Sequence, residues 1–92
     1  MIRSFRDKEA EAIFHRKRVR VFQQVEGVAL RRLVQIDSAH ELRDLASPPA
    51  NRLESLKGDR AGQYSVRIND QYRICFRWKD GDAFDVEITD YH

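Results

Sequence analysis

The sequence predicts a small α+β domain in which two to three helices pack on one face of an antiparallel β-sheet. With 92 residues, the chain has the length of one domain, spanning 1–92. In the first 50 residues apolar side chains recur at helical spacing, whereas between Leu53 and Ile88 they alternate with a period of two. Helices therefore come first, and the sheet that they cover follows.

The N-terminal half contains one possible strand and two expected helices. Residues 2–5 suit a short opening strand, and residues 7–18 form an amphipathic pattern with acidic residues early and basic residues late, the order that the helix dipole favours. A second helix is expected from Val25 onward because four residues share one apolar stripe. These are Val25, Ala29, Leu33 and Ile36.

Capping and proline signals divide the segment that follows. Ser38 and Glu41 have the spacing of a capping box, which predicts a further short helix that ends at Leu45. Pro48 and Pro49 then end the helical structure, because proline lacks the amide donor that a helix interior needs.

The alternating half predicts an antiparallel meander with one apolar face, formed by Val66, Ile68, Ile74, Phe76, Phe84, Val86 and Ile88. Residues directly opposite each other on antiparallel strands share a face, so loop lengths set the register. A three-residue loop at 69–71 sets Val66 against Ile74. A second three-residue loop at 79–81, with its glycine in a left-handed bulge position, sets Ile74 against Val86.

These registers concentrate charge on the opposite face. Arg67 falls opposite Arg73, and Arg73 falls opposite Glu87. Like charges directly opposed across strands cost up to about 1 kcal/mol. Two interpretations stay open: a solvated ladder of ion pairs, or a face that receives phosphate, whose geometry the guanidinium fork matches.

Charge is unevenly distributed along the chain. Residues 52–79 hold 7 Lys and Arg against 3 Asp and Glu, whereas residues 80–92 hold 5 acidic residues and no Lys or Arg. A basic middle segment suits an anionic polymer as partner, although a solvated ionic surface has the same composition. The basic run at 16–20 likewise allows either a contact with ribosomal RNA or a solvated helix end.

Cysteine content and hydropathy indicate a cytoplasmic protein without a membrane partner. Cys75 is the only cysteine, which excludes an intrachain disulfide and a thiolate metal cluster, and we expect a structural or spectator thiol. Residues 1–14 lack the apolar run of about 7 to 15 residues found in signal peptides. No stretch approaches the roughly 20 apolar residues of a membrane span.

Three motifs occur in order along the chain. They are Leu56-Lys57-Gly58-Asp59-Arg60, the run SVRINDQYRICF at 65–76, and the ending VEITDYH at 86–92. Together they resemble the HigB branch of RelE/ParE-type toxins over essentially the whole chain. The resemblance implies a small antiparallel sheet with helices on one side and a cleft on the other. It also implies an endoribonuclease that cuts mRNA in the ribosomal A site. Its expected partner is a helix-turn-helix antitoxin, through which alone it would reach operator DNA.

RNA cleavage needs no metal or other cofactor when side chains move the protons. The ribose 2′-hydroxyl is the nucleophile, so a base, a cation beside the phosphate and an acid at the departing oxygen suffice. The resemblance makes His92, Asp90, Tyr91 and Lys57 the catalytic candidates. Arg60, Arg67 and Arg73 are candidates for binding RNA phosphates.

The candidates differ in what their chemistry offers. Imidazole titrates near neutral pH, so His92 is the expected proton-transfer group. Asp90 would orient it or act as a base, and Tyr91 would stack on a base or donate its hydroxyl. Where some relatives have a histidine before the Lys57 motif, this chain has Glu54, which is a poor acid at pH 7 unless its pKa is raised.

Two alternatives remain on the same fold. One is a non-catalytic toxin that binds DNA gyrase, as ParE-type relatives do; the terminal histidine argues against it. The other is an RNA-binding protein that disturbs ribosome assembly, with which the basic face is equally compatible.

Overall fold

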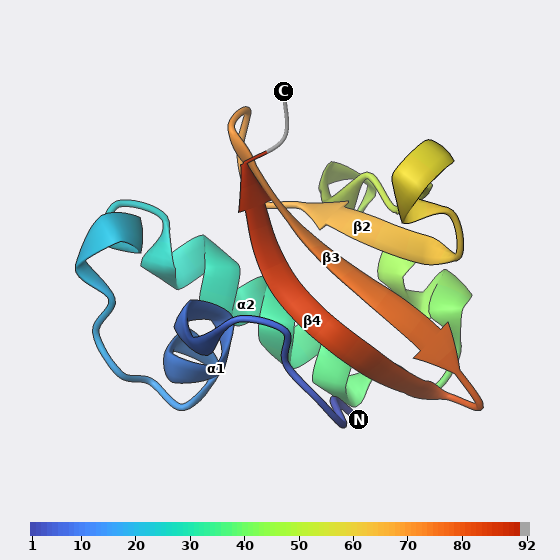
Figure 1. Cartoon of the computed structure of the whole chain (residues 1–92), viewed down its shortest axis with the longest axis horizontal. Coiled ribbons are helices and arrows are strands. Elements are labelled where there is room, and N and C mark those ends of the chain that lie inside the picture. The colour runs from blue at the N-terminus through green and yellow to red at the C-terminus, as the bar shows by residue number, and fades with distance from the viewer. Residues whose placement is uncertain (91–92) are drawn as a thin grey trace.

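The computed structural model describes residues 1–90 and contains two α-helices and a four-stranded antiparallel sheet (Figure 1). The helices are α1 (Lys8–Phe14) and α2 (Glu26–Ser38). The strands, adjacent in chain order, are β1 (Glu54–Ser55), β2 (Gln63–Arg67), β3 (Tyr72–Lys79) and β4 (Asp82–Asp90). Four 3₁₀ turns connect them: η1 (Arg20–Phe22), η2 (Leu42–Ala46), η3 (Pro49–Asn51) and η4 (Gly58–Arg60). The predicted fold class is confirmed.

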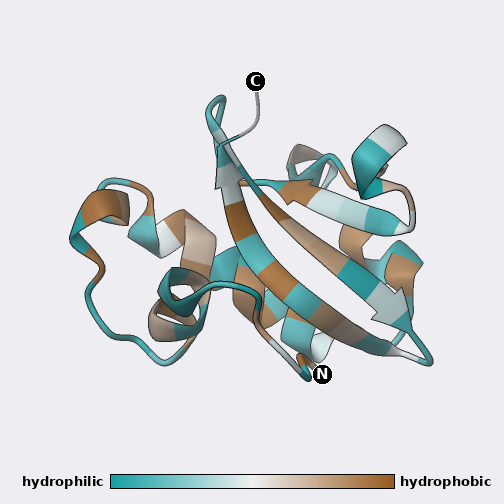
Figure 2. Ribbon diagram, viewed as in Figure 1, coloured by the Kyte–Doolittle hydropathy of each residue, from teal (hydrophilic) through white to brown (hydrophobic). Residues whose placement is uncertain are grey.

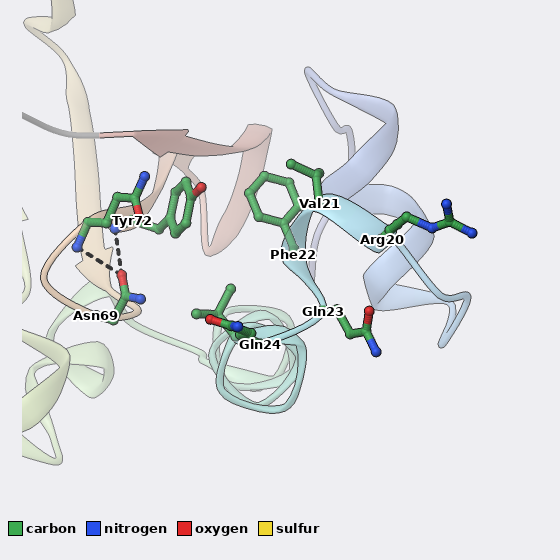
Figure 3. Close-up of a pocket in the computed structure, with 9 residues that line it drawn as sticks. Arg20, Val21, Phe22, Gln23, Gln24, Asn69 and Tyr72 are labelled. Carbon is green, nitrogen blue, oxygen red and sulfur yellow. Dashed lines mark hydrogen bonds between the residues drawn. The ribbon is translucent and has the colours of Figure 1, made fainter.

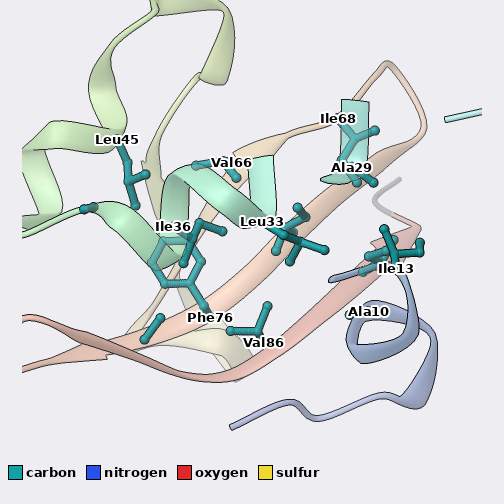
Figure 4. Packing of buried hydrophobic residues seen from close by; sticks show 14 residues of the cluster. Ala10, Ile13, Ala29, Leu33, Ile36, Leu45, Val66, Ile68, Phe76 and Val86 are labelled. Atoms are coloured by element: carbon teal, nitrogen blue, oxygen red, sulfur yellow. The ribbon is translucent and has the colours of Figure 1, made fainter. Parts of the chain in front are cut away.

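The core lies between the helices and one face of the sheet (Figure 4). From the helices it takes Ala10, Ile13, Ala29, Leu33 and Ile36, and from the strands Val66, Ile74, Phe76, Val86 and Ile88. Each large side chain buried here stabilises the fold by about 1.5–3 kcal/mol. The expected apolar stripe of the second helix is largely confirmed, since only Val25 of its four residues is partly exposed.

The N-terminal segment attaches α1 to the outer edge of β4. Residues 2–5 do not form the expected opening strand, because Ile2 and Phe5 make only isolated parallel bridges with Ala83 and Val86. Asp7 caps α1 by accepting a hydrogen bond from the Ala10 amide at 2.7 Å. The helix is shorter than expected because Arg16 adopts a left-handed φ of 63°, so helical geometry cannot continue through residue 18.

Two local predictions after α2 require correction. The capping box is formed by Glu41 and Asp44 rather than by Ser38 and Glu41, because Ser38 still belongs to α2. Helical structure also continues past the prolines as η3, where Pro49 occupies the first helical position and needs no amide donor.

The predicted register of the first hairpin is confirmed, and that of the second hairpin is wrong. Val66 pairs with Ile74 across the predicted loop at 69–71. The turn between β3 and β4 has two residues rather than three, since Lys79 pairs with Asp82. Asp80 and Gly81 both have positive φ (52° and 82°), as a type I′ turn requires.

A β-bulge at Asp85 compensates for the shorter turn. The pairing shifts between Cys75 and Arg77, and Asp85, with φ of 54°, is the extra residue. Beyond the bulge Ile74 pairs with Ile88, so Val86 and Ile88 return to the core. Figure 2 shows the resulting alternation of apolar and polar residues along this part of β4. Before it, Phe84 pairs with Arg77 and leaves the apolar face to which the sequence assigned it. No helix among residues 1–90 is long and apolar enough to cross a membrane.

Candidate functional site

The face of the sheet turned away from the helices carries most of the predicted phosphate ligands. We call it the polar face; it comprises Gln63, Ser65, Arg67, Arg73, Cys75, Arg77, Phe84, Glu87 and Thr89. The segment from Arg52 to Gly62 contacts this face through side chains, and Gln63, Ser65 and Cys75 are consequently buried. Because the shorter turn and the bulge together shift the register by two residues, Arg73 lies opposite Thr89, not opposite Glu87 as predicted.

Arg73 is held rigidly near the middle of this face. Its Nε donates to Ser65 Oγ at 2.8 Å, and its Nη2 donates to the Arg52 carbonyl at 2.6 Å. The Glu54 carboxylate lies 3.8 Å from Nη2, and the Arg73 side chain is only 11% exposed. The guanidinium of Arg73 is therefore held in one position, and the nearby Glu54 carboxylate partly neutralises its positive charge.

Arg60 connects the loop that carries Lys57 to β4. Its Nη1 lies 3.2 Å from Glu87 Oε2 and 3.0 Å from Gln63 Oε1. Lys57 itself is exposed and directly precedes η4. The ion pair thus fixes the turn next to Lys57 above the sheet.

Cys75 lies beneath these charges. Burial raises the pKa of its thiol, with the Glu87 carboxylate acting in the same direction and Thr89, Arg60 and Arg73 opposing it. Both arginines therefore lie near one buried point of the polar face. A raised pKa keeps the thiol protonated, as suits the structural role expected for Cys75.

Arg67 is engaged at the end of β2. Its guanidinium forms an ion pair with Asp70 in the β2–β3 loop, and its carbonyl accepts a hydrogen bond from Arg32 Nε at 3.0 Å. Burial lowers the pKa of Arg32, as do the charges of Arg31 and Arg67. This end of the sheet therefore combines several cations close to the β2–β3 loop.

Asp90 ends β4 at the same end of the sheet. It pairs with Tyr72 on β3, and its Oδ2 accepts a hydrogen bond from Gln71 Nε2 at 3.1 Å. Tyr91 and His92 lie outside the described residues, so the predicted approach of His92 to Lys57 and Arg73 stays a prediction. Among residues 1–90, no group of three or more His, Cys, Asp and Glu side chains is arranged to hold a metal ion.

A pocket of about 280 Å³ lies beside Tyr72 and was not expected from the sequence (Figure 3). It is lined by residues 20–25 together with Asn69, Gln71 and Tyr72. The rings of Phe22 and Tyr72 meet edge to face at 5.1 Å. The only sequence signal for it was an aromatic residue, Phe22, two positions after the basic run.

Comparison with protein families and curated proteins identifies relatives. Residues 3–92 match the family model described as the RelE-like toxin of type II toxin-antitoxin system HigB. Toxin HigB-1 of Vibrio cholerae is 39% identical over 90 residues, which cover 96% of this chain and 95% of that protein. Endoribonuclease HigB of Proteus vulgaris is 39% identical over 61 residues, which cover 66% of this chain and 65% of that protein.

Solved structures share the fold at lower sequence identity. The YoeB–YefM toxin-antitoxin heterotetramer of Staphylococcus aureus matches with a TM-score of 0.56 and 20% identity, covering 100% of this chain and 98% of the other. A YoeB/ParE toxin of Agrobacterium tumefaciens matches with a TM-score of 0.51 and 17% identity, covering 96% of each chain. From its match to the family model over nearly its whole length and its identity to Toxin HigB-1, this chain belongs to the RelE-like HigB toxins of type II toxin–antitoxin systems.

Proposed function

We propose that this toxin is a cytoplasmic endoribonuclease that cleaves mRNA in the ribosomal A site. The observation that carries the proposal is the pair of anchored cations, Arg73 and Arg60, on the polar face of a sheet whose last described residue is Asp90. The name of the Proteus vulgaris relative, Endoribonuclease HigB, supports RNA cleavage as the activity. A gyrase inhibitor has no need of a proton-transfer group at the chain end.

In the proposed reaction the ribose 2′-hydroxyl attacks the adjacent phosphate. His92 or Asp90 accepts the hydroxyl proton, while Lys57 and Arg73 stabilise the charge that develops on the phosphate oxygens. The bond to the 5′-oxygen breaks, and that oxygen takes a proton from an acid, for which the Tyr91 hydroxyl or protonated His92 is suitable. The products are a 2′,3′-cyclic phosphate and a 5′-hydroxyl end, and no metal takes part.

The two remaining arginines are proposed to act differently. Arg60 already pairs with Glu87, so a phosphate must compete with that carboxylate, and Arg60 chiefly positions the turn beside Lys57. Arg67 lies at the β2–β3 loop with Asp70 and would hold a phosphate of the same RNA nearer Asp90.

A cognate helix-turn-helix antitoxin is the proposed neutralising partner. Two of the similar solved structures are complexes of a toxin with an antitoxin. Binding to operator DNA would then occur only through that antitoxin, whereas mRNA and the ribosome would be direct partners of the toxin.

Mapping RNA ends after brief induction of the toxin tests the proposal. We expect new 5′-hydroxyl ends within translated mRNAs, and their loss in a His92→Ala variant but not in His40→Ala, which removes an exposed histidine elsewhere. Loss of one acid or base should slow cleavage by about 10²- to 10⁴-fold. Intact mRNA with DNA damage signalling would indicate the gyrase alternative, and intact mRNA with immature ribosomal RNA the assembly alternative.

A further inference from the structure

Phe84 is a large aromatic residue that the fold keeps out of its core. It pairs with Arg77 and therefore points to the polar face, where it is partly exposed. Within residues 1–90, neither the buried core cluster nor the partly buried side chains packed against it include Phe84. Burial in this core therefore does not explain an aromatic residue at this position.

The two-residue turn sets Phe84 opposite Arg77 on the polar face, and the β-bulge at Asp85 returns the rest of β4 to the core. Without the extra residue, the two-residue turn would carry Val86 and Ile88 to the polar face together with Phe84. Asp85 adopts a φ of 54°, which is uncommon for a residue other than glycine. Bulges are over-represented at sheet edges and next to active sites, and this one leaves Phe84 as the aromatic residue of β4 that faces away from the core.

Two cations line a pocket together with the partly exposed ring of Phe84. Phe84 lines an open pocket of about 520 Å³ together with Gly62, Arg77, Trp78, Lys79 and Asp85. Arg77 is kept in place by Asp85, whose Oδ2 lies 3.6 Å from its Nε. Gly62 leaves room for the guanidinium, since a Cβ atom there would come within 3.2 Å of Arg77 Nη1.

We propose that Phe84 and Arg77 form a stacking subsite for an unpaired base of the RNA that this toxin cleaves. Aromatic rings and guanidinium planes are the groups on which proteins stack single-stranded bases. The pocket lining has a net positive charge because it contains two cations, Arg77 and Lys79, and one carboxylate, Asp85. A positive charge suits the anionic backbone of RNA. This subsite rests on the proposed function.

The position of the subsite agrees with one continuous strand of RNA. Arg73, Cys75 and Arg77 share the polar face at alternate positions of β3, so Arg77 lies about 13 Å along the strand from Arg73. The subsite would thus hold a base away from the phosphate being cut, toward the β3–β4 turn. In Figure 1 this turn and the C-terminal end of β4 lie at opposite ends of the sheet.

Tryptophan fluorescence of the full-length chain offers a direct test, because Trp78 is the only tryptophan and lines the pocket. The probe is a single-stranded decamer of 2′-O-methyl RNA, which cannot be cleaved. We expect its binding to change the Trp78 emission and Phe84→Leu to weaken its affinity roughly 5- to 100-fold, the range of base–aromatic stacking. Phe84→Tyr should retain the affinity. Arg77→Gln should weaken it more than Arg31→Gln, which removes an exposed cation of α2.

Each result bears on the subsite separately from the cleavage reaction. Phe84→Leu should raise the KM for RNA cleavage in a translation extract and leave kcat within a few-fold. If the wild-type chain itself did not cleave RNA in the extract, the proposed function would be refuted. Equal RNA affinity of Phe84→Leu and the wild type would overturn the subsite, as would absence of decamer binding. Unchanged RNA affinity with a weakened antitoxin complex would also overturn it and assign the pocket to the antitoxin. Phe84→Leu should melt close to the wild type because the ring is outside the core.

Discussion

Arg60 and Glu87 lie 27 residues apart in the sequence and form an ion pair with 3.2 Å between Nη1 and Oε2. Glu87 also lies 3.8 Å from Arg6 Nε. One carboxylate on β4 thus holds both the turn beside Lys57 and the N-terminal segment, so a structural contact links the candidate site to the edge of the sheet.

We predict that Glu87→Gln leaves the fold intact and loosens the turn beside Lys57. Since Glu87 is partly exposed, the loss should be modest, about 0.5–1 kcal/mol in unfolding free energy. RNA cleavage should fall about two- to fivefold if the same energy is lost from positioning. Chemical denaturation and cleavage assays measure the two effects, with Glu11→Gln, an exposed carboxylate of α1, as control. Wild-type cleavage by Glu87→Gln would show that the ion pair does not position the site.

Glu54 competes with phosphate for Arg73, in our interpretation of the 3.8 Å contact between the two side chains. Glu54→Gln should therefore tighten binding of uncleavable RNA and keep the cleavage rate within about threefold, because opposite charges within this range attract. Asp59→Asn, which neutralises an exposed carboxylate of the nearby turn η4, is the matched control. A loss of about 100-fold in rate would instead identify Glu54 as a general base.

Asn51 is fully buried and supports the segment that reaches Arg73. Its Nδ2 donates to the carbonyls of Leu45 and Ser47 and to Gln35 Oε1. Asn51→Ala should lower the unfolding free energy by about 2–3 kcal/mol, because buried acceptors lose their donor. Denaturant titration measures the change, and Gln24→Ala, which removes an exposed amide, should have little effect. An equal loss in both variants would contradict the proposed support role of Asn51.

The shifted pKa values of three aspartates determine how the stability of the fold is expected to depend on pH. The pKa of Asp82 is lowered by Arg3 and the N-terminal amine, and the pKa of Asp44 is lowered by hydrogen bonds from the Glu41 and His40 amides. Carboxylates with lowered pKa stabilise the fold above about pH 4, and this stabilisation is lost as the pH falls. Burial raises the pKa of Asp7, which has the opposite effect: its penalty for holding a charge disappears on acidification.

Melting temperatures between pH 3 and 6 test these signs. We expect stability to decline below about pH 4. Asp82→Asn should flatten the decline, because it removes a group that loses its favourable charge interactions in acid. A curve for Asp82→Asn that runs parallel to the wild type would contradict the assignment.

The sequence predicted the layers and the first hairpin because both depend on a regular apolar pattern. The prediction for the second hairpin was wrong because it assumed that β3 and β4 pair without a bulge, which requires a three-residue turn to keep the apolar face intact. The Asp80-Gly81 dipeptide instead favours a two-residue type I′ turn. A two-residue turn keeps Val86 and Ile88 in the core only if one residue is inserted, so the bulge at Asp85 could have been deduced from those two facts.

The candidate site was predictable in composition but not in its contacts. The motifs pointed to Arg60 and Arg73, yet a linear pattern does not show which carboxylate each arginine meets. Glu87 was expected opposite Arg73 and instead forms an ion pair with Arg60, since the shorter turn and the bulge together shift the register by two residues. The pocket beside Phe22 and Tyr72 was missed because it joins two loops that share no motif.

Cleavage of a defined mRNA in a translation extract tests the central claim most directly. The wild-type chain should produce 5′-hydroxyl ends inside the message, and His92→Ala and Lys57→Ala should each reduce the rate by about 10²- to 10⁴-fold. Cleavage at wild-type rates by both variants would contradict the assignment of catalysis to the last residue and the Lys57 turn.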